Sequence, residues 1–237
     1  MTHGINEQGM VMAEYELNGV KLVIPDAMLS KRIAEKLEKG RYEGHEAQAA
    51  LMRVRGGSRV LELGSGLGYI ASICAAIAGP ENVTTVEANP DMLPVVRDNL
   101  DRNSFQSVTL LHGAVTGQVG GEEAIEFERT KAFWGASIAR EGSNRDTIVE
   151  VPLLRLSDLL ATYRPHIVIM DIEGAEQTLF DVPWPEHVRS VMMELHPGRY
   201  PDTTIKKIVD CMSASGLTYD PGPSRGRILG FRKLRGA

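Results

Sequence analysis

The stretch that decides the fold is Arg59-Val60-Leu61-Glu62-Leu63-Gly64-Ser65-Gly66-Leu67-Gly68-Tyr69-Ile70. An apolar run ends in an acid, three glycines alternate with other residues, and a helical pattern then begins. This order predicts a buried strand that turns tightly into a helix, because glycine adopts positive φ and lets a ligand approach the main chain. The free N–H groups at the start of such a helix favour a negatively charged or electron-rich ligand group.

The spacing of the glycines narrows the choice of ligand. Gly64, Gly66 and Gly68 give G-x-G-x-G with Glu62 ahead of them, whereas a dinucleotide fingerprint reads G-x-G-x-x-G. The E-x-G-x-G-x-G form resembles the first motif of Rossmann-like methyltransferases that use S-adenosylmethionine. A nicotinamide-dependent oxidoreductase is one alternative, and a glycine-rich turn without a ligand is another.

A second acid follows one strand–helix–strand unit later. Residues 82–87 are rich in β-branched side chains and end at Glu87, before Ala88-Asn89-Pro90, which predicts a second buried strand. A carboxylate at the tip of this strand can accept hydrogen bonds from both ribose hydroxyls of a nucleoside. Glu87 is therefore the predicted ribose ligand, and a solvated acid at a strand end is the alternative interpretation.

Alternating strand and helix patterns continue to the C-terminus and predict an α/β domain, with a mainly parallel sheet covered by helices on both faces. The predicted strands are 59–63, 83–87, 107–112, 166–171, 189–194 and 228–232, and the predicted helices are 43–54, 68–79, 91–103 and 201–215. Residues 123–152 break this rhythm and predict extra short strands and a loop. The final strand is expected to be antiparallel.

The first 40 residues differ from the rest and predict an N-terminal extension, with the main domain at residues 41–237. Asn18-Gly19 between two apolar runs is typical of a type I′ hairpin turn. A helix is expected over residues 26–39, with Asp26 as its N-cap and Gly40 as its stop.

Composition excludes several classes of protein. The 237 residues are 43% hydrophobic and 24% charged, with a formal net charge of −5, which is ordinary for a globular domain and argues against a general nucleic-acid binder. The two cysteines form neither a disulfide framework nor a metal-site pattern. The polar start and the short apolar runs predict a cytoplasmic protein without a membrane span.

Several motifs together resemble the FkbM family of methyltransferases. They are Tyr42-Glu43, Glu62 to Gly68, Glu87-Ala88-Asn89-Pro90, Leu154 to Leu160, Asp171-Ile172-Glu173-Gly174-Ala175-Glu176 and Glu194-Leu195-His196-Pro197. The resemblance covers roughly residues 40–200. It departs from the family at Glu62-Leu63-Gly64-Ser65, where Asp-Ile-Gly-Ala is more common.

The resemblance implies a Rossmann-like class I methyltransferase fold with a seven-stranded sheet and S-adenosyl-L-methionine as cofactor. It further implies O-methylation of a hydroxyl group on a small molecule of natural-product or sugar type. The predicted cofactor-binding residues are Glu62, Gly64, Ser65, Gly66, Glu87, Ala88, Asn89, His112, Gly113, Ala114 and Asp171.

The chemistry of a hydroxyl acceptor suggests further roles, since its proton needs a base. Glu173 and His196 are the favoured bases, and Asp171 is expected to orient the methionine end of the cofactor or the acceptor. The residues predicted to contact the substrate are Tyr42, Glu43, Trp134 and Glu194. For Trp134 and His196, core packing and turn capping are the competing interpretations. No metal ligand is assigned.

Four alternatives stay open at this stage. A metal-assisted O-methyltransferase could use Asp171 and Glu194 as hard oxygen ligands, and a non-catalytic protein could bind S-adenosylmethionine without transferring its methyl group. Methylation of a nucleic-acid amine is disfavoured, since residues 171–174 do not read N/D-P-P-Y/F/W. A basic cluster in the tail could attract an acidic or phosphorylated substrate: Arg225, Arg227, Arg232, Lys233 and Arg235. The oligomeric state is also open, a homodimer included.

Overall fold

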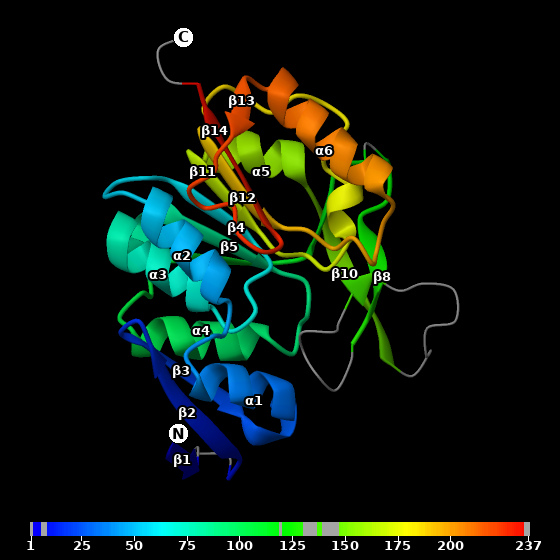
Figure 1. Ribbon diagram of the computed structural model, residues 1–237. Coiled ribbons are helices and arrows are strands. Elements are labelled where there is room, and N and C mark those ends of the chain that lie inside the picture. The colour runs from blue at the N-terminus through cyan, green and yellow to red at the C-terminus, as the bar shows by residue number, and fades with distance from the viewer. Residues whose placement is uncertain (1, 6–8, 119, 130–136, 139–146, 235–237) are drawn as a thin grey trace.

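A seven-stranded sheet forms the centre of the protein (Figure 1). The computed structural model describes residues 2–5, 9–118, 120–129, 137–138 and 147–234. In spatial order the sheet consists of β13 (Leu217–Tyr219), β14 (Ile228–Lys233), β12 (Ser190–Glu194), β11 (Ile167–Met170), β4 (Val60–Leu63), β5 (Val83–Glu87) and β6 (Thr109–His112).

The pairing of these strands confirms the expected fold class. Strands β6, β5, β4, β11 and β12 are parallel, whereas β14 is antiparallel to both of its neighbours. The chain runs outward from β4 to β6 in one direction and from β11 to β12 in the other. In open sheets of this kind, ligands bind beyond the carboxyl ends of the strands where the order reverses.

Helices cover both faces of the sheet, as the alternation of buried residues along the strands requires. Ile167 and Ile169 of β11 pack with α2 (Gly44–Arg53), α3 (Tyr69–Ala78) and α4 (Leu93–Arg102). Val168 and Met170 of the same strand pack with α5 (Leu156–Tyr163) and α6 (Asp202–Ala214). Figure 1 shows α2 and α3 on one side of the strands and α5 and α6 on the other.

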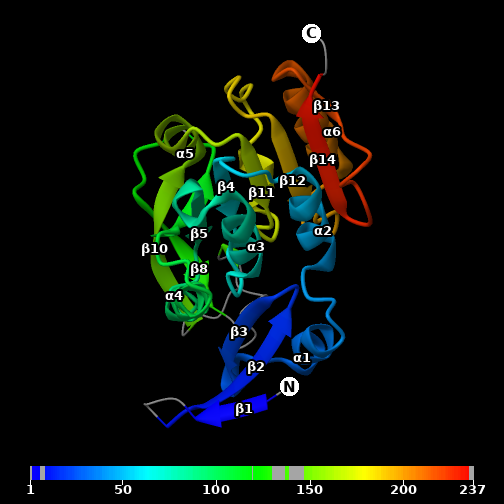
Figure 2. The same cartoon turned by 90° about the vertical axis from the view of Figure 1, so that its left-hand side faces the viewer.

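The N-terminal segment forms a small sheet and a helix beside α3 and α4 (Figure 2). Its strands are β1 (Thr2–Ile5), β2 (Val11–Leu17) and β3 (Val20–Pro25), followed by the 3-10 helix η1 (Asp26–Met28) and by α1 (Lys31–Glu38). The φ angles of Asn18 (49°) and Gly19 (76°) are both positive, which confirms the predicted type I′ turn.

The predicted start of the first helix was wrong. Asp26 opens η1, and α1 begins only at Lys31, with Ser30 as its N-cap. The Ser30 hydroxyl oxygen accepts a hydrogen bond from the Ile33 amide at 3.3 Å, as serine commonly does at this position. The N-terminal segment shares one apolar core with α2 to α4, and a domain boundary at residue 40 stays a prediction.

The extra strands expected within residues 123–152 are present. They belong to a second sheet with the order β7 (Ala114–Thr116), β10 (Ile148–Arg155), β8 (Ala124–Glu128) and β9 (Ser137–Ile138). Trp134, a predicted substrate contact, lies outside the described residues. In the described part of the chain, the helices are all too short or too polar to cross a membrane.

Candidate functional site

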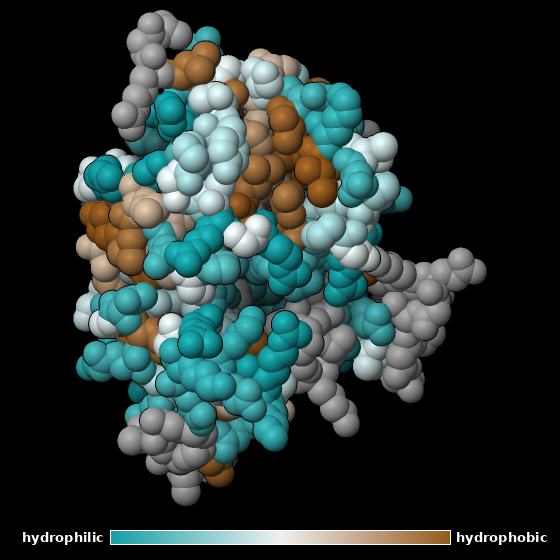
Figure 3. Space-filling model, viewed as in Figure 1, coloured by the Kyte–Doolittle hydropathy of each residue, from teal (hydrophilic) through white to brown (hydrophobic). Residues whose placement is uncertain are grey.

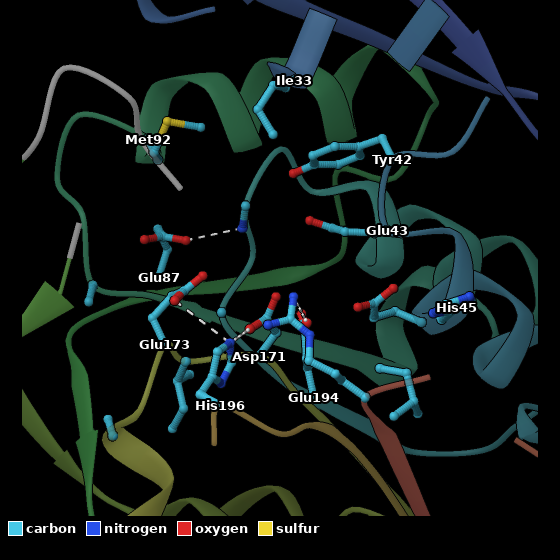
Figure 4. Close-up of a pocket in the computed structure, with 18 of the residues that line it drawn as sticks. Ile33, Tyr42, Glu43, His45, Glu87, Met92, Asp171, Glu173, Glu194 and His196 are labelled. Atoms are coloured by element: carbon cyan, nitrogen blue, oxygen red, sulfur yellow. Dashed lines mark hydrogen bonds and ion pairs between the residues drawn. The ribbon is translucent and has the colours of Figure 1, made fainter. Parts of the chain in front are cut away.

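A pocket of about 970 Å³ opens at the carboxyl edge of the central sheet. Its walls come from α1, the start of α2, the glycine loop, the ends of β5 and β12, and the turn before β14. Figure 4 shows Ile33 and Tyr42 on one side of this space, with Asp171, Glu173, Glu194 and His196 on the other. A volume near the upper end of the usual 300–1,000 Å³ range can hold a cofactor and a small second molecule.

The glycine loop brings bare main chain to the pocket. Gly64 and Gly66 line it, with φ angles of 92° and 54°. A Cβ atom on Gly64 would lie 2.0 Å from the backbone oxygen of Asp171, and one on Gly66 would lie 2.8 Å from the side-chain oxygens of Tyr42 and Glu43. The loop therefore needs glycine both for its φ angles and for its close contacts.

Glu87 lies beside this loop and faces the pocket (Figure 4). Its Oε2 accepts hydrogen bonds from the amides of Ser65 and Gly66 at 3.2 Å each, and its Oε1 accepts one from the Asn89 amide at 2.7 Å. Burial raises the pKa of Glu87 to about 7, against these stabilising amides. The carboxylate thus holds the loop in place and keeps lone pairs that can accept from a ligand hydroxyl.

Glu62, the first acid of the motif, lies beneath the loop rather than on the pocket wall. Its side chain accepts a hydrogen bond from the Thr85 hydroxyl, which lies 2.6 Å from the Ser65 hydroxyl. The residue is 2% exposed, and burial raises its pKa to about 8. This position explains how Glu62 supports the loop, and its direct contact with a cofactor stays a prediction.

The other predicted cofactor residues also divide into those that line the pocket and those that lie outside its lining. Ala88, Gly113, Ala114 and Asp171 line the pocket, whereas Ser65, Asn89 and His112 are outside its lining.

Three carboxyl groups and one histidine form the floor of the pocket: Asp171, Glu173, Glu194 and His196. His196 Nε2 lies 3.4 Å from Asp171 Oδ1 and 3.7 Å from Glu173 Oε2. These residues come from the loop after β11 and from the end of β12 and the loop after it, because adjacent parallel strands deliver their carboxyl ends to the same edge of the sheet. We call this set the acidic floor.

Behind the acidic floor, Glu176 holds the histidine ring. Its Oε1 lies 2.9 Å from His196 Nδ1, and Glu176 is completely buried. Burial disfavours the charged form of His196, but the hydrogen bond and charge of Glu176, with the charges of Asp171 and Glu173, outweigh it and raise the His196 pKa to about 8. A carboxylate that fixes one ring nitrogen leaves the other aimed at a reacting group, as in catalytic triads.

Further carboxyl groups crowd the other end of the acidic floor. Burial, together with the charges of Glu194, Glu173 and Glu46, raises the pKa of Asp171 well above its usual value. Burial and the adjacent Glu194 likewise raise the pKa of Glu46. So many half-buried carboxyl groups favour a cationic ligand.

Two groups of side chains could also hold a metal ion. They are Asp171, Glu173 and His196, and Glu46, Asp171 and Glu194, with all ligand atoms of each group within 4.8 Å of one another. Oxygen-rich sets of this kind suit hard divalent cations, so the metal-assisted alternative stays open.

Tyr42 and Glu43 also belong to the pocket, where the resemblance placed them. Glu43 adopts the left-handed conformation (φ 43°) at the start of α2, and Glu173 does so (φ 50°) after β11. Such backbone geometry is uncommon outside glycine and concentrates at functional sites. Burial raises the pKa of Glu43, and its Oε2 is buried without a hydrogen-bond partner in the described part of the chain.

These features fit S-adenosylmethionine on chemical grounds. The cofactor carries a sulfonium and an ammonium group, which the acidic floor and Glu43 would attract. Its ribose hydroxyls suit Glu87, and the glycine loop leaves main chain exposed beside that carboxylate. The orphaned Oε2 of Glu43 is a buried acceptor that such a ligand can satisfy.

Sequence reasoning missed two residues of the site. Glu46 lines the pocket, and Glu176 positions His196. Glu176 ends the Asp171-Ile172-Glu173-Gly174-Ala175-Glu176 motif, and that motif was the signal that could have identified it.

One segment of the chain is similar in sequence to a known protein family. Residues 42–132 match the family model for protein-L-isoaspartate(D-aspartate) O-methyltransferase. The chain is 36% identical over 80 residues to protein-L-isoaspartate O-methyltransferase of Methanococcoides burtonii, covering 33% of this chain and 38% of that protein. It is 39% identical over 77 residues to the enzyme of Ignicoccus hospitalis, covering 32% and 36%. The chain thus matches little more than a third of the length of these relatives.

Solved structures of methyltransferases also align with the chain. Precorrin-6y C5,15-methyltransferase of Geobacter metallireducens is 14% identical, with a TM-score of 0.46 over 82% of this chain and 89% of that one. An O-methyltransferase of Bacillus cereus in complex with SAH is 12% identical, with a TM-score of 0.43 over 88% and 84%.

The strand order and the glycine loop are those of a Rossmann-like fold, and within it residues 42–132 resemble the protein-L-isoaspartate(D-aspartate) O-methyltransferase family. The family model that matches differs from the FkbM family, so membership of that family is not confirmed.

Proposed function

We propose that this protein transfers the methyl group of S-adenosylmethionine to a hydroxyl group of a small molecule. The observation that carries this proposal is His196, whose Nδ1 is held by buried Glu176 and whose Nε2 faces Asp171 and Glu173 in the pocket. A hydroxyl acceptor must lose a proton when it is methylated, and this arrangement supplies a base for it. The FkbM-like motifs that contain these residues support the same acceptor.

When bound, the cofactor supplies an electrophilic methyl carbon on a positively charged sulfur. Glu87 would hold the ribose of the cofactor, and the acidic floor would hold its positively charged end, so that the methyl group could be transferred to an acceptor oxygen in the same pocket. His196 Nε2 takes the hydroxyl proton, while Glu176 stabilises the resulting imidazolium. The pocket walls would position the acceptor beside the methyl group, and such positioning can contribute roughly 7–11 kcal/mol.

Methylation of a carboxyl group is the second candidate, because the relatives are named protein-L-isoaspartate O-methyltransferases. The match to their family ends at residue 132, so it includes the glycine loop and Glu87 but none of the acidic floor. A carboxylate acceptor is already deprotonated near neutral pH and needs no base. Three carboxyl groups on the floor would also repel it. A hydroxyl acceptor therefore agrees better with the described residues.

Cofactor binding is tested first, by thermal unfolding with S-adenosylhomocysteine and with NAD in parallel. At about 100 times the dissociation constant, a bound ligand adds about 2.7 kcal/mol to the free energy of unfolding. We expect the midpoint to rise with S-adenosylhomocysteine only. A rise with NAD only would make the loop a dinucleotide site and overturn the proposal.

Glu87→Ala tests the assignment of the ribose ligand. We expect S-adenosylhomocysteine to bind more weakly by about 1–3 kcal/mol, because a buried hydrogen-bond partner is lost. Calorimetry measures this, with Glu81→Ala as the control, since Glu81 is an exposed acid just before β5. Unchanged affinity in Glu87→Ala would reject the assignment.

The acceptor atom is tested by the stability of the product. Labelled methyl groups from S-adenosylmethionine are offered with an isoaspartyl peptide and, separately, with polyhydroxylated small molecules. Methyl ethers withstand mild alkali, whereas carboxyl methyl esters release methanol. Alkali-stable label on the small molecules supports the proposal, and alkali-labile label on the peptide alone would favour the second candidate. Activity lost with a chelator and restored by Mg²⁺ would establish the metal-assisted form.

A further inference from the structure

The charges that line the pocket are arranged in two layers. Its acidic residues are buried or half-buried: Glu43, Glu46, Glu87, Asp171, Glu173 and Glu194. The arginines and lysines of the same lining are all exposed: Arg32, Lys36, Arg41, Arg225 and Arg227. We call this second set the cationic rim. Figure 3 shows a largely hydrophilic surface over α1 and a hollow between α1 and the rest of the molecule.

The cationic rim is assembled from both ends of the chain. Arg32, Lys36 and Arg41 belong to α1 and the loop after it, whereas Arg225 and Arg227 belong to the turn before β14. The chain as a whole has a net charge of −5. Five exposed cations therefore belong to the lining of one pocket in a chain whose overall charge is negative.

Part of the cationic rim has no internal charge to neutralise it. Arg227 pairs with Glu194 of the acidic floor at 2.7 Å. Within the residues that the structure describes, Lys36, Arg41 and Arg225 form no ion pair. Their charges are therefore available to an anion that enters the pocket.

The remaining basic residues of the tail have structural partners instead. Arg232 Nε lies 3.8 Å from Asp220 Oδ1, and Lys233 Nζ donates to the Ser215 backbone oxygen at 3.0 Å. Neither residue lines the pocket. The basic cluster seen in the sequence thus divides into two rim residues and two that stabilise the fold, with Arg235 outside the described residues.

We propose that the methyl acceptor is anionic and that the cationic rim binds its phosphate or carboxylate group. The inference rests on the proposed function, because it takes the acidic floor as the place where the hydroxyl group reacts. A molecule with a hydroxyl at one end and an anionic group at the other matches both layers of charge. Its anionic end lies beside Lys36, Arg41 and Arg225, the rim residues that form no ion pair in the described part of the chain.

Inorganic pyrophosphate is the probe that tests the cationic rim, with citrate as the carboxylate probe. The rim variant is Lys36→Gln/Arg41→Gln/Arg225→Gln. The control variant is Lys31→Gln/Arg102→Gln/Lys206→Gln, which removes the same charge from three exposed residues outside the pocket lining. Calorimetry measures binding of each probe to protein saturated with S-adenosylhomocysteine.

We expect pyrophosphate to bind the rim variant at least about tenfold more weakly than the unchanged protein, with little change in the control. Binding to the unchanged protein should weaken as salt is raised, since the rim is exposed. Tighter binding of citrate than pyrophosphate would assign the carboxylate source, and the reverse would assign phosphate. Equal losses in the two variants, or no binding of either probe to the unchanged protein, would overturn the proposal.

S-adenosylhomocysteine affinity, measured on the same samples, separates this proposal from the proposed function. The rim variant should keep that affinity, because none of its three residues belongs to the glycine loop or the acidic floor. If the unchanged protein binds pyrophosphate through the rim but not S-adenosylhomocysteine, the proposed function fails and the anion site stands. If it binds S-adenosylhomocysteine but neither probe, only the anion site fails.

Discussion

His196 has three acidic neighbours that lie on two sides of its ring. Glu176, which is fully buried, fixes the ring through Nδ1, and the half-buried Asp171 and Glu173 lie near Nε2 at the pocket surface. A histidine with a pKa of about 8 is mostly protonated near neutral pH. A cationic cofactor in the same pocket would disfavour that extra charge and lower the pKa. Cofactor binding would thereby help to convert His196 into the free base.

Glu176→Gln tests the positioning role of Glu176. The glutamine oxygen can still accept from Nδ1, but the negative charge is lost, so the His196 pKa should fall from about 8 toward 6.5. NMR titration of the histidine signals measures this change, and the acidic limb of the activity profile should move to lower pH with it. Glu173→Gln is the comparison, because Glu173 is farther away and 31% exposed, and its effect should be smaller. Equal pKa changes in the two variants would contradict this role.

At the scale of elements, the glycine loop depends on two other segments of the chain. The start of α2 places Tyr42 and Glu43 against Gly66, and the loop after β11 places Asp171 against Gly64. The loop is therefore shaped by contacts with two segments that are distant in sequence, as well as by its own φ angles.

Gly66→Ala should abolish measurable binding of S-adenosylhomocysteine while the protein stays folded. Its Cβ would meet the Tyr42 and Glu43 oxygens at 2.8 Å, at a φ of 54° that alanine rarely adopts. Gly121→Ala is the control, because its Cβ would meet nothing within 4 Å, its φ is not positive and it lies outside the pocket lining. Calorimetry and circular dichroism separate binding from folding, and full affinity in Gly66→Ala would show that these contacts can relax.

Most elements of the central sheet could be predicted from the sequence, because buried parallel strands are short apolar runs that end in polar residues. β5 begins at Val83 and ends at Glu87, as expected. The start of α1 was misjudged because Asp26 and Ser30 are both good N-cap residues, and only Ser30 makes the capping bond. The grouping of Asp171, Glu173 and His196 could also be predicted, because the strands that they follow end at the same edge of the sheet.

Other parts of the site depend on tertiary structure that local patterns do not carry. Glu62 has the position of a cofactor ligand in the motif, yet the hydrogen bond from Thr85 of the adjacent strand holds it beneath the loop. Glu176 reaches His196 only because the 3-10 turn η5 (Ala175–Thr178) folds back against the end of β12. The cationic rim joins residues from the two ends of the chain, and no sequence window contains both.

At the scale of the whole molecule, three titratable groups in and beneath the site make the folded protein less stable as the pH rises. The pKa values of Glu62 and Glu87 are raised to about 8 and about 7 by burial, so the folded state keeps protons that the unfolded state has lost above about 4.5. His196, raised to about 8, acts in the same direction, since its stabilising charge disappears as the pH passes that value. Glu62 and Glu87 make the free energy of unfolding fall from pH about 4.5 up to about 8 and about 7, respectively, and His196 adds to this fall between pH about 6.5 and about 8.

Glu62→Gln tests the contribution of Glu62 alone, which is the one of these three groups that lies outside the pocket lining. Glutamine keeps an oxygen that can accept from Thr85 but cannot ionise, so the cost of a buried charge at higher pH is removed. Urea unfolding without cofactor, at several pH values between about 5 and about 8, should give a smaller decline in the free energy of unfolding than in the unchanged protein. The two proteins should differ most at the upper end, where the variant is the more stable. Glu81→Gln, an exposed acid, should leave the decline unchanged. A decline as steep in Glu62→Gln as in the unchanged protein would mean that Glu62 does not retain its proton in the folded state.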